Sequence, residues 1–431
     1  MTTKKLPAPL KKDDTSKQKS LFDAKGKIKQ AVDFLNEHYV IHIPVNDPTK
    51  VRVECRDPNR YSESPTFDDI YLHFVEECET VISETILRKI IRSKNYIKPY
   101  DPIKTYLDSI RGKYAGKSHI DLLCSFLKFR EFDADNPTYS TDRANLLIRK
   151  WFVSSIAQWI ENAPNDVMLT FIQAGEGYGK TSLVNYIIPQ ALKDYSVTAS
   201  NNDSRFDIED AYTRFAFIVH DELIGINKGS IETWKSIMTA KKLQTKRRYE
   251  EVAIDRKRIG IAVATTNKNQ ENGGFIHADK HNFGSRRFGC IELEYINWEE
   301  YIKVVDPDQL WAEALMLYES SDFSWKFTRE VDFHEFDYYN EKYIIETVAS
   351  RYVNLFLAHP SEEEGEWMNA SEILQDFRKN RLINRNDFGK IGAVSLGVSL
   401  TNLGFEYKSI RKEGKIPFKR YHVKRLYINN K

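Results

Sequence analysis

The chain has 431 residues, of which 41% are hydrophobic, 29% charged and 13% aromatic. This balance is typical of a soluble globular protein and excludes a disordered or fibrous chain. The 64 basic and 62 acidic side chains nearly cancel, so a polyanion partner would have to be recognised by local basic patches. The length favours two or three domains.

The cysteines and the N-terminus indicate where the protein resides. The 4 cysteines are scattered without a CxxC pair, which argues against a disulfide framework and against a cysteine-based zinc site. The basic N-terminus is followed by no apolar segment, and the chain has no run of about 18 apolar residues. We therefore expect a cytoplasmic protein that is neither exported nor membrane-spanning.

The N-terminal third predicts a tail followed by helices. Residues 1–28 are rich in Lys, Asp, Ser and Pro, which predicts a disordered basic tail. Residues 29–140 predict a mostly helical domain, with a short strand at Tyr39–Val45 and one or two amphipathic helices after it.

Residues 141–330 predict an α/β domain with a largely parallel sheet, because strand-like apolar runs alternate with helical patterns. Near its start, Val167–Ala174 is typical of a buried strand and Lys180–Tyr195 of a helix, and the segment between them is rich in glycine. Glycine lets consecutive backbone N–H groups point inward at a helix N-terminus, which is how such loops hold phosphate.

This segment nearly matches the phosphate-binding loop of P-loop NTPases. Lys180 would reach the β- and γ-phosphates of ATP, and the Thr181 hydroxyl would bind Mg²⁺. Ala174 stands where the pattern has its first glycine, and a glycine-rich turn with a solvated lysine is the alternative interpretation of this stretch alone. The predicted nucleotide contacts are Gly175, Glu176, Gly177, Tyr178, Gly179, Lys180, Thr181 and Ser182.

Two further predicted strands end in polar residues. Asp221 and Glu222 follow an apolar run, at the crevice where parallel sheets bind ligands. Asp221 would hold Mg²⁺ through water, and Glu222 would activate the attacking water as a general base. Asn267 ends another apolar run, where its amide would sense the γ-phosphate. Each of these is compatible with a turn by itself, but polar tips on three strands favour an ATP site.

Arg286 and Arg287 precede a further predicted strand. Paired arginines are compatible with a solvated face or an acid-binding patch. In ring ATPases an arginine at this place reaches the γ-phosphate held by the neighbouring subunit. Hydrolysis would then require an oligomer, and the sequence leaves open which arginine acts.

A basic segment lies between Glu222 and Asn267. The alternation in KRRYEEVAI, followed by DRK as a turn, predicts a β-hairpin. Directed toward a ring pore it would bind a phosphate backbone, whereas an exposed charged hairpin without a ligand is the alternative. The predicted DNA contacts are Lys246, Arg247, Arg248, Arg256, Lys257 and Arg258.

The C-terminal region predicts a helical linker at 331–367 and a small module at 368–431. In the module Asn369 caps a helix, a second helix stops at Gly404, and a hairpin turns at KEGK. Helix, helix and basic hairpin is the order of a winged-helix domain, which would bind DNA or, alternatively, another protein. Its predicted DNA contacts are Lys408, Arg411, Lys412, Lys415, Lys419 and Arg420.

Together, GYGKTSLV, VHDEL, the basic hairpin, ATTN and GSRRF resemble the superfamily 3 helicases of the AAA+ class, and more closely the virulence-associated protein E family of phage and mobile-element ATPases. LLIRKWFVSSIAQW and DPDQLWAEAL extend the resemblance over roughly residues 100–320. It implies a bacterial, ATP- and Mg²⁺-dependent replicative DNA helicase or replication initiator, forming a hexameric ring on single-stranded and origin DNA. The catalytic residues that it implies are Lys180, Glu222, Asn267, Arg286 and Arg287.

The chain departs from the family at Ala174 and at TKRRYEE, where relatives often have an Arg-Pro-Pro-Tyr-like segment. Many relatives carry an upstream primase, but Asp68 and Asp69 adjoin a helical run and are interpreted as an N-cap and a first-turn acid. We therefore expect no primase in this chain, and a separate primase or other replication proteins would be partners. Two other functions stay open: an oligomeric ATPase switch without unwinding, and a DNA-binding initiator with an inert nucleotide site.

Overall fold

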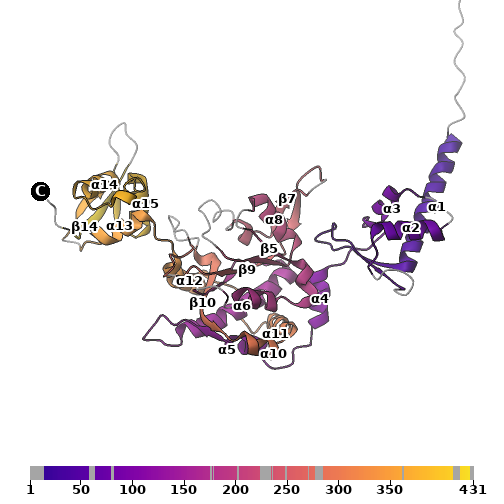
Figure 1. Ribbon diagram of the computed structural model, residues 1–431, viewed down its shortest axis with the longest axis horizontal. Coiled ribbons are helices and arrows are strands. Elements are labelled where there is room, and N and C mark those ends of the chain that lie inside the picture. Colours follow the sequence, from indigo (N-terminus) through magenta and orange to yellow (C-terminus); the bar gives the residue numbers. More distant parts are fainter. Residues whose placement is uncertain are drawn as a thin grey trace, which may run out of the picture. The chain divides into compact units, whose positions relative to one another are not determined.

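The computed structural model (Figure 1) describes residues 14–57, 64–78, 82–174, 177, 179–200, 203–223, 234, 236–247, 250–269, 271–276, 285–361, 364–410 and 418–427. For residues 14–24 and 402 it describes the backbone alone. Contacts divide the chain into two compact units, Met1–Thr105 and Tyr106–Lys431.

The first unit combines helices with a two-stranded antiparallel sheet. Its elements are α1 (Asp14–His38), β1 (Tyr39–His42), β2 (Arg52–Cys55), α2 (Phe67–Glu77) and α3 (Glu84–Ile91). Phe34, Ile70 and Leu87, one from each helix, share a buried core. The predicted amphipathic region thus forms two helices. Thr66 caps α2, so neither aspartate is the predicted N-cap. Both lie in the first turn, and Asp69 completes the capping box.

Part of the predicted tail is helical. Residues 14–28, which we expected to be disordered, lie in α1, and residues 1–13 lie outside the described part of the chain. The helix is fixed by the buried side chains of Ala31, Phe34 and Leu35. Once those turns have formed, each residue added to the helix gains one backbone hydrogen bond, so propagation is easier than nucleation. The helix therefore extends into the polar stretch that precedes them.

The second unit is built on a six-stranded sheet with the order β3-β10-β4-β9-β6-β5. Its strands are β3 (Leu127–Phe129), β10 (Phe288–Ile296), β4 (Met168–Ile172), β9 (Ile261–Thr266), β6 (Phe217–His220) and β5 (Ser196–Thr198). β3 runs antiparallel to β10, and the other neighbours are parallel. This confirms the predicted mixed α/β fold with a mostly parallel central sheet.

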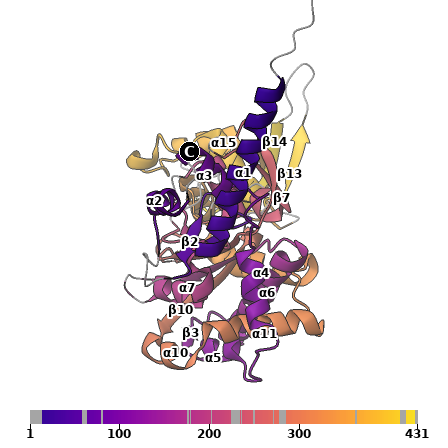
Figure 2. The same cartoon turned by 90° about the vertical axis from the view of Figure 1, so that its right-hand side faces the viewer.

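Helices cover both faces of this sheet, which is why its strands are continuous apolar runs. On one face α6 (Tyr139–Glu161) and α11 (Pro307–Ser320) lie side by side (Figures 1 and 2). There Trp159 and Trp311 stack 5.0 Å apart, and both rings contact Phe217. The opposite face packs against α8 (Arg205–Arg214) and α12 (His334–Asn340) in a second core.

The remaining helices around the sheet are α4 (Pro102–Ile110), α5 (His119–Ser125), α7 (Lys180–Ile187) and α10 (Trp298–Val304). Glu313 of α11 accepts hydrogen bonds from the Ser118 hydroxyl and the Ile120 amide at the start of α5. β3 also pairs with the central sheet. Residues 106–140, which we assigned to the helical N-terminal domain, therefore pack with the α/β domain.

The basic segment forms a hairpin of β7 (Lys242–Thr245) and β8 (Ile254–Lys257). The predicted boundaries were wrong, since DRK lies within β8 instead of forming a turn. Leu243 and Thr245 are buried while Lys242 and Gln244 are exposed. The alternating strand therefore begins before KRRYEEVAI, the segment in which we predicted the hairpin.

The C-terminal elements are α13 (Val348–Phe356), β11 (Leu357–Ala358), β12 (Glu366–Asn369), α14 (Ala370–Lys379), α15 (Ala393–Asn402), β13 (Tyr407–Ile410) and β14 (Phe418–Arg425). β14 pairs antiparallel with β11, β12 and β13, the last visible in Figure 2. Asn369 caps α14 as predicted. Tyr352 of α13 shares a core with Phe377 and Val423, so α13 belongs to this module rather than to a linker.

No helix in the described part of the chain combines the length and the apolar character needed to cross a membrane.

His220 in β6 gives the fold a pH dependence. Its side chain is buried against Trp234, and its Nε2 has no hydrogen-bond partner among the described residues. Burial lowers the pKa of His220 from 6.5 to about 3. The unfolded chain therefore takes up a proton below about pH 6.5 that the folded chain does not, and folding stability falls as the pH decreases toward 3.

We expect this residue to lower the free energy of unfolding by about 2 kcal/mol between pH 7 and pH 5. His220→Phe keeps an aromatic contact with Trp234 and removes the titrating group, so this part of the pH dependence should disappear. Urea unfolding of both proteins at the two pH values measures it. Equal losses in both would contradict a neutral buried His220.

Candidate nucleotide-binding site

The segment between β4 and α7 has the strand–turn–helix form that a phosphate-binding loop requires. Gly177 and Gly179 have φ of +80° and +88°, a region that glycine occupies without strain. Gly179 is the N-cap of α7, which begins at Lys180. Gly175, Glu176 and Tyr178 lie outside the described residues.

A pocket of about 470 Å³ lies at the carboxyl edge of the sheet. Its lining residues come from the loop, α7, the ends of β6 and β9 and the start of α10, and are Gly177, Gly179, Lys180, Thr181, Ser182, Asp221, Glu222, Thr265, Asn267 and Trp298. β9 lies between β4 and β6, so Asn267 is held between the loop and the acidic pair. The predicted polar tips of three strands thus meet in one cavity.

Asp221 is at the centre of the hydrogen bonds in this pocket. Its Oδ1 accepts from the Thr181 hydroxyl at 2.8 Å and from the Thr265 hydroxyl at 2.6 Å. The Glu222 amide donates to the Thr265 hydroxyl oxygen at 3.3 Å. Thr265 was not predicted from the sequence, although its spacing of two from Asn267 places both side chains on the same face of the strand.

Lys180 and Glu222 differ in exposure. Lys180 is buried, and its Nζ donates to the Gln173 carbonyl at the end of β4 at 3.2 Å. Glu222 is exposed and has φ of +52°, which is strained for a residue with a side chain. Such strain costs about 1–3 kcal/mol, and strained residues cluster at functional sites. There the unusual backbone conformation gives the side chain a direction that a relaxed backbone would not.

The oxygen atoms around Asp221 fit Mg²⁺. Neighbouring ligands of octahedral Mg²⁺ lie about 2.9 Å apart, given its bond lengths of about 2.0–2.1 Å. The Thr181 hydroxyl and the Asp221 carboxylate oxygen are 2.8 Å apart. Mg²⁺ is usually bound by one or two protein oxygens together with substrate phosphates and water. Thr181 and Asp221 are the residues that would hold it.

Trp298 also lines the pocket and was not predicted. It is the first residue of α10, and half of its surface is exposed. An exposed indole at the edge of the pocket offers a flat apolar surface on which an aromatic ring could stack. No sequence pattern marks it, because only the packing of α10 brings it to the loop.

Arg286 and Arg287 lie at the opposite edge of the sheet. They precede β10, whose first residue, Phe288, pairs with Met168 at the start of β4. The pocket lies beyond the other end of β4, about 16 Å away along a five-residue strand. Within one chain these arginines are therefore separated from the pocket by the length of the sheet.

The two arginines have different environments. Arg287 is buried and forms an ion pair with Asp166, and burial lowers its pKa to about 10. Arg286 is half-buried, with its guanidinium 5.5 Å from the centre of the Phe333 ring. Arg287 is thus fixed to its own chain, and Arg286 is the better placed of the two to contact another molecule.

The structure places two of the predicted DNA contacts in the hairpin, Arg247 and Arg258, in the protein interior. Arg258 is 1% exposed and donates to the Gln158 side chain and to the carbonyls of Ala240, Gly260 and Asn165. Burial lowers its pKa to about 10. Arg247 is also buried and pairs with Asp210 at 3.0 Å. Both guanidinium groups stabilise the fold and are not accessible to a phosphate backbone.

The other basic residues of the hairpin vary in accessibility. Lys246 is exposed. Arg256 pairs with Glu250 and donates to the Thr245 carbonyl, and Lys257 Nζ donates to the Trp159 carbonyl at 2.8 Å. Arg248 lies outside the described residues.

In the C-terminal module, two of the predicted lysines each lie beside an aromatic ring. Lys408 Nζ lies 4.1 Å from the centre of the Trp367 ring, and Lys419 Nζ lies 3.6 Å from that of Tyr407. Arg420 pairs with Glu372 at 2.9 Å. The remaining predicted contacts, Arg411, Lys412 and Lys415, lie outside the described residues.

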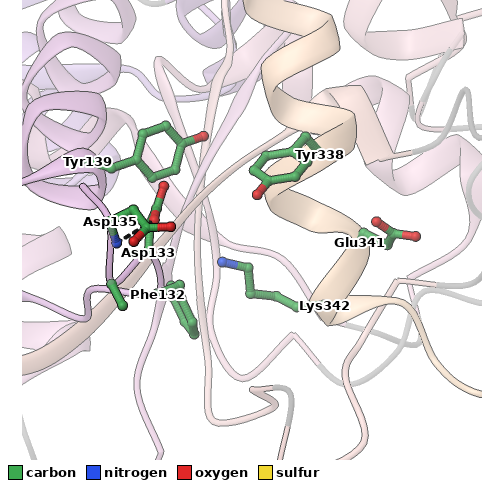
Figure 3. Close-up of a pocket in the computed structure, with 8 residues that line it drawn as sticks. Phe132, Asp133, Asp135, Tyr139, Tyr338, Glu341 and Lys342 are labelled. Carbon is green, nitrogen blue, oxygen red and sulfur yellow. Dashed lines mark hydrogen bonds between the residues drawn. The ribbon is translucent and has the colours of Figure 1, made fainter. Parts of the chain in front are cut away.

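A second cavity, of about 760 Å³, lies between the segment after β3 and α12 (Figure 3). Lys342 points into it, with Nζ 3.3 Å from the centre of the Phe132 ring, and burial lowers its pKa to about 8. Tyr139 and Tyr338 point toward the same space, and Asp133 lines it. This cavity is the larger one, but none of the predicted site residues lines it.

The chain belongs to the family of virulence-associated protein E-like domains, whose pattern it matches over residues 113–342. This is more than half of the chain, and it confirms the resemblance seen in the sequence. No significant match is found among curated proteins.

Among solved structures, the chain is similar to the apo structure of NrS-1 C terminal region (305–718), with 13% identity, 92% of this chain and 98% of the other covered, and a TM-score of 0.44. It is also similar to JCV Helicase, with 11% identity, coverage of 63% and 77%, and a TM-score of 0.29. These likenesses are too remote to bear on function.

Proposed function

We propose that this protein is an ATP- and Mg²⁺-dependent DNA helicase that serves the replication of a mobile genetic element and works as a ring oligomer on single-stranded DNA. The observation that carries the proposal is the pocket that unites Lys180, Thr181, Asp221, Glu222 and Asn267. Family membership supports the replication role, since the virulence-associated protein E resemblance implies it.

Each residue of the pocket has a role in hydrolysis. Lys180 leaves the Gln173 carbonyl to contact the β- and γ-phosphates, and the N–H groups at the start of α7 stabilise their charge. Thr181 and Asp221 would hold Mg²⁺, which would offset the negative charge of the phosphates. Glu222 accepts a proton from the attacking water, and Asn267 orients that water against the γ-phosphate.

The separation of the arginines from the pocket favours catalysis between subunits. Arg286 cannot reach the phosphates of its own chain across the sheet, so a finger role requires a neighbouring copy. In a ring, the amino edge of one sheet would face the carboxyl edge of the next. The hexamer follows from the family resemblance. The P-loop AAA+ core and the winged helix predicted at residues 368–431 belong to the same proposal.

DNA binding rests on fewer basic residues than the sequence indicated. Lys246 on the hairpin, and Lys408 and Lys419 beside aromatic rings, are the described groups best placed to meet phosphates and bases. We therefore expect moderate affinity with a strong salt dependence.

Lys246→Ala tests the hairpin contact. The plot of log K against log salt concentration has a negative slope. Removing one phosphate contact should make that slope less steep by about 0.7 for single-stranded DNA. Fluorescence anisotropy at several salt concentrations measures the slope. Lys303→Ala, an exposed lysine on α10 paired with Glu300, is the control and should leave the slope unchanged. An unchanged slope in Lys246→Ala would remove the hairpin from the DNA interface.

The burial of Arg247 and Arg258 favours a second candidate, an oligomeric ATPase switch that does not unwind DNA. A forked duplex with one labelled strand separates the two functions. ATP-dependent strand release that is lost in Lys180→Ala supports the helicase. DNA-independent hydrolysis with no strand release would support the switch.

A further inference from the structure

Two histidines and a glutamate lie close together in the first unit, apart from every residue used above. His38 is the last residue of α1, and His73 and Glu77 are four residues apart on α2. Their ligand atoms all lie within 4.8 Å of one another. His38 Nε2 lies 3.3 Å from one carboxylate oxygen of Glu77, and His73 Nε2 lies 2.7 Å from the other.

The buried ring of His73 is oriented from its other nitrogen. The Tyr39 hydroxyl lies 2.6 Å from His73 Nδ1, and the ring is 2% exposed, edge-on to Phe34. Histidines that bind metal usually have their second ring nitrogen held by such an outer partner. With Nδ1 held by Tyr39, Nε2 is directed toward Glu77 and His38.

The electrostatic field at this cluster favours a cation. α1 ends at His38 and α2 ends at Glu77, so the C-termini of both helices meet there. Each helix C-terminus carries roughly half a negative charge, concentrated in the last turn. The Glu77 carboxylate adds to this, and 37% of its side chain is exposed, which gives an ion access from solvent.

We propose that His38, His73 and Glu77 bind a divalent transition-metal ion of the zinc class, with a fourth position open to water. Two imidazoles and one carboxylate are a donor set that Zn²⁺ uses, whereas Mg²⁺ and Ca²⁺ prefer oxygen ligands. Neighbouring ligands of tetrahedral Zn²⁺ lie about 3.3 Å apart, as His38 Nε2 and the Glu77 oxygen already do. The bound ion would link the end of α1 to α2.

Titration of the chelator-treated full chain with Co²⁺ tests this site, in excess Mg²⁺ and without nucleotide. We expect one equivalent of tetrahedral Co²⁺ by its visible absorption, displaced by Zn²⁺, and a rise in melting temperature with Zn²⁺. Tyr39→Phe should weaken Zn²⁺ binding about 10–100-fold, and His38→Asn should weaken it more. His38 is partly exposed, so His38→Asn avoids the folding defect that a change at buried His73 would risk.

His42→Asn is the matched control. His42 also faces a glutamate, Glu54 at 3.7 Å, but it belongs to no group of three possible metal ligands among the described residues. This variant should retain full Zn²⁺ affinity. Absence of stoichiometric Co²⁺ binding, or equal affinities of the wild type and His38→Asn, would overturn the site and leave histidine–carboxylate hydrogen bonds only. The site shares no residue with the nucleotide pocket, so neither result depends on the proposed function.

Discussion

We expect Glu222→Gln to lower the kcat for ATP hydrolysis by at least about 100-fold while the affinity for ATP stays nearly unchanged. The substitution keeps the size of the side chain and its place at the edge of the pocket, but an amide cannot accept the proton of the attacking water. Positioned general bases contribute about 100- to 10,000-fold, which sets the expected loss. Steady-state hydrolysis and the binding of a fluorescent ATP analogue measure the two quantities.

Two further variants serve as comparisons for Glu222→Gln. Glu299→Gln alters an exposed carboxylate next to Trp298 that does not line the pocket, and it should hydrolyse ATP at the wild-type rate. Lys180→Ala should lose nucleotide binding as well as turnover, since it removes the phosphate contact itself. If Glu222→Gln retained full kcat, Glu222 would not be the base, and its strained backbone would need another explanation.

Arg286→Ala and Arg287→Ala should affect different properties of the protein, catalysis in the first and folding stability in the second. Arg286→Ala is expected to lower kcat about 1,000-fold or more, because a finger arginine acts on the transition state. Its half-buried side chain contacts Phe333, so this variant should lose less stability than Arg287→Ala. Arg287→Ala breaks the ion pair between buried Arg287 and half-buried Asp166 and should lower the free energy of unfolding by about 2 kcal/mol. Hydrolysis rates together with urea unfolding of both variants distinguish the two roles.

Mixing subunits tests whether Arg286 acts on a neighbour. Arg286→Ala chains keep an intact pocket, and Lys180→Ala chains keep an intact arginine, so mixed oligomers should regain hydrolysis that neither variant has alone. The sheet separates the two groups within one chain, which is the reason for this expectation. No recovery in oligomers shown to be mixed would contradict catalysis between subunits.

The strands and the residues at their tips could be predicted from the sequence, because buried parallel strands are continuous apolar runs that end abruptly in polar residues. Lys180, Asp221 and Asn267 follow such runs, and the carboxyl ends of parallel strands meet at one edge of a sheet. Thr265 and Trp298 were missed for opposite reasons. Thr265 lies within the predicted strand that ends at Asn267, but the sequence does not show that it pairs with Asp221. Trp298 reaches the pocket only through tertiary packing.

The basic residues were the least predictable part, because burial of an arginine depends on partners distant in the chain. Arg258 finds its acceptors on α6 and the segment after it, and Arg247 pairs with Asp210 on α8. Charge density alone made all of these residues look like one DNA-binding surface. The cluster of His38, His73 and Glu77 was not predicted from the sequence for the same reason, since only the fold brings the end of α1 to α2.

Steady-state ATPase activity of the purified protein, with and without single-stranded DNA, tests the central claim most directly. The proposed function predicts turnover that DNA stimulates and that Lys180→Ala and Arg286→Ala abolish, with Ala174 tolerated in the loop. No turnover under either condition would contradict it and would favour a DNA-binding initiator with an inert nucleotide site.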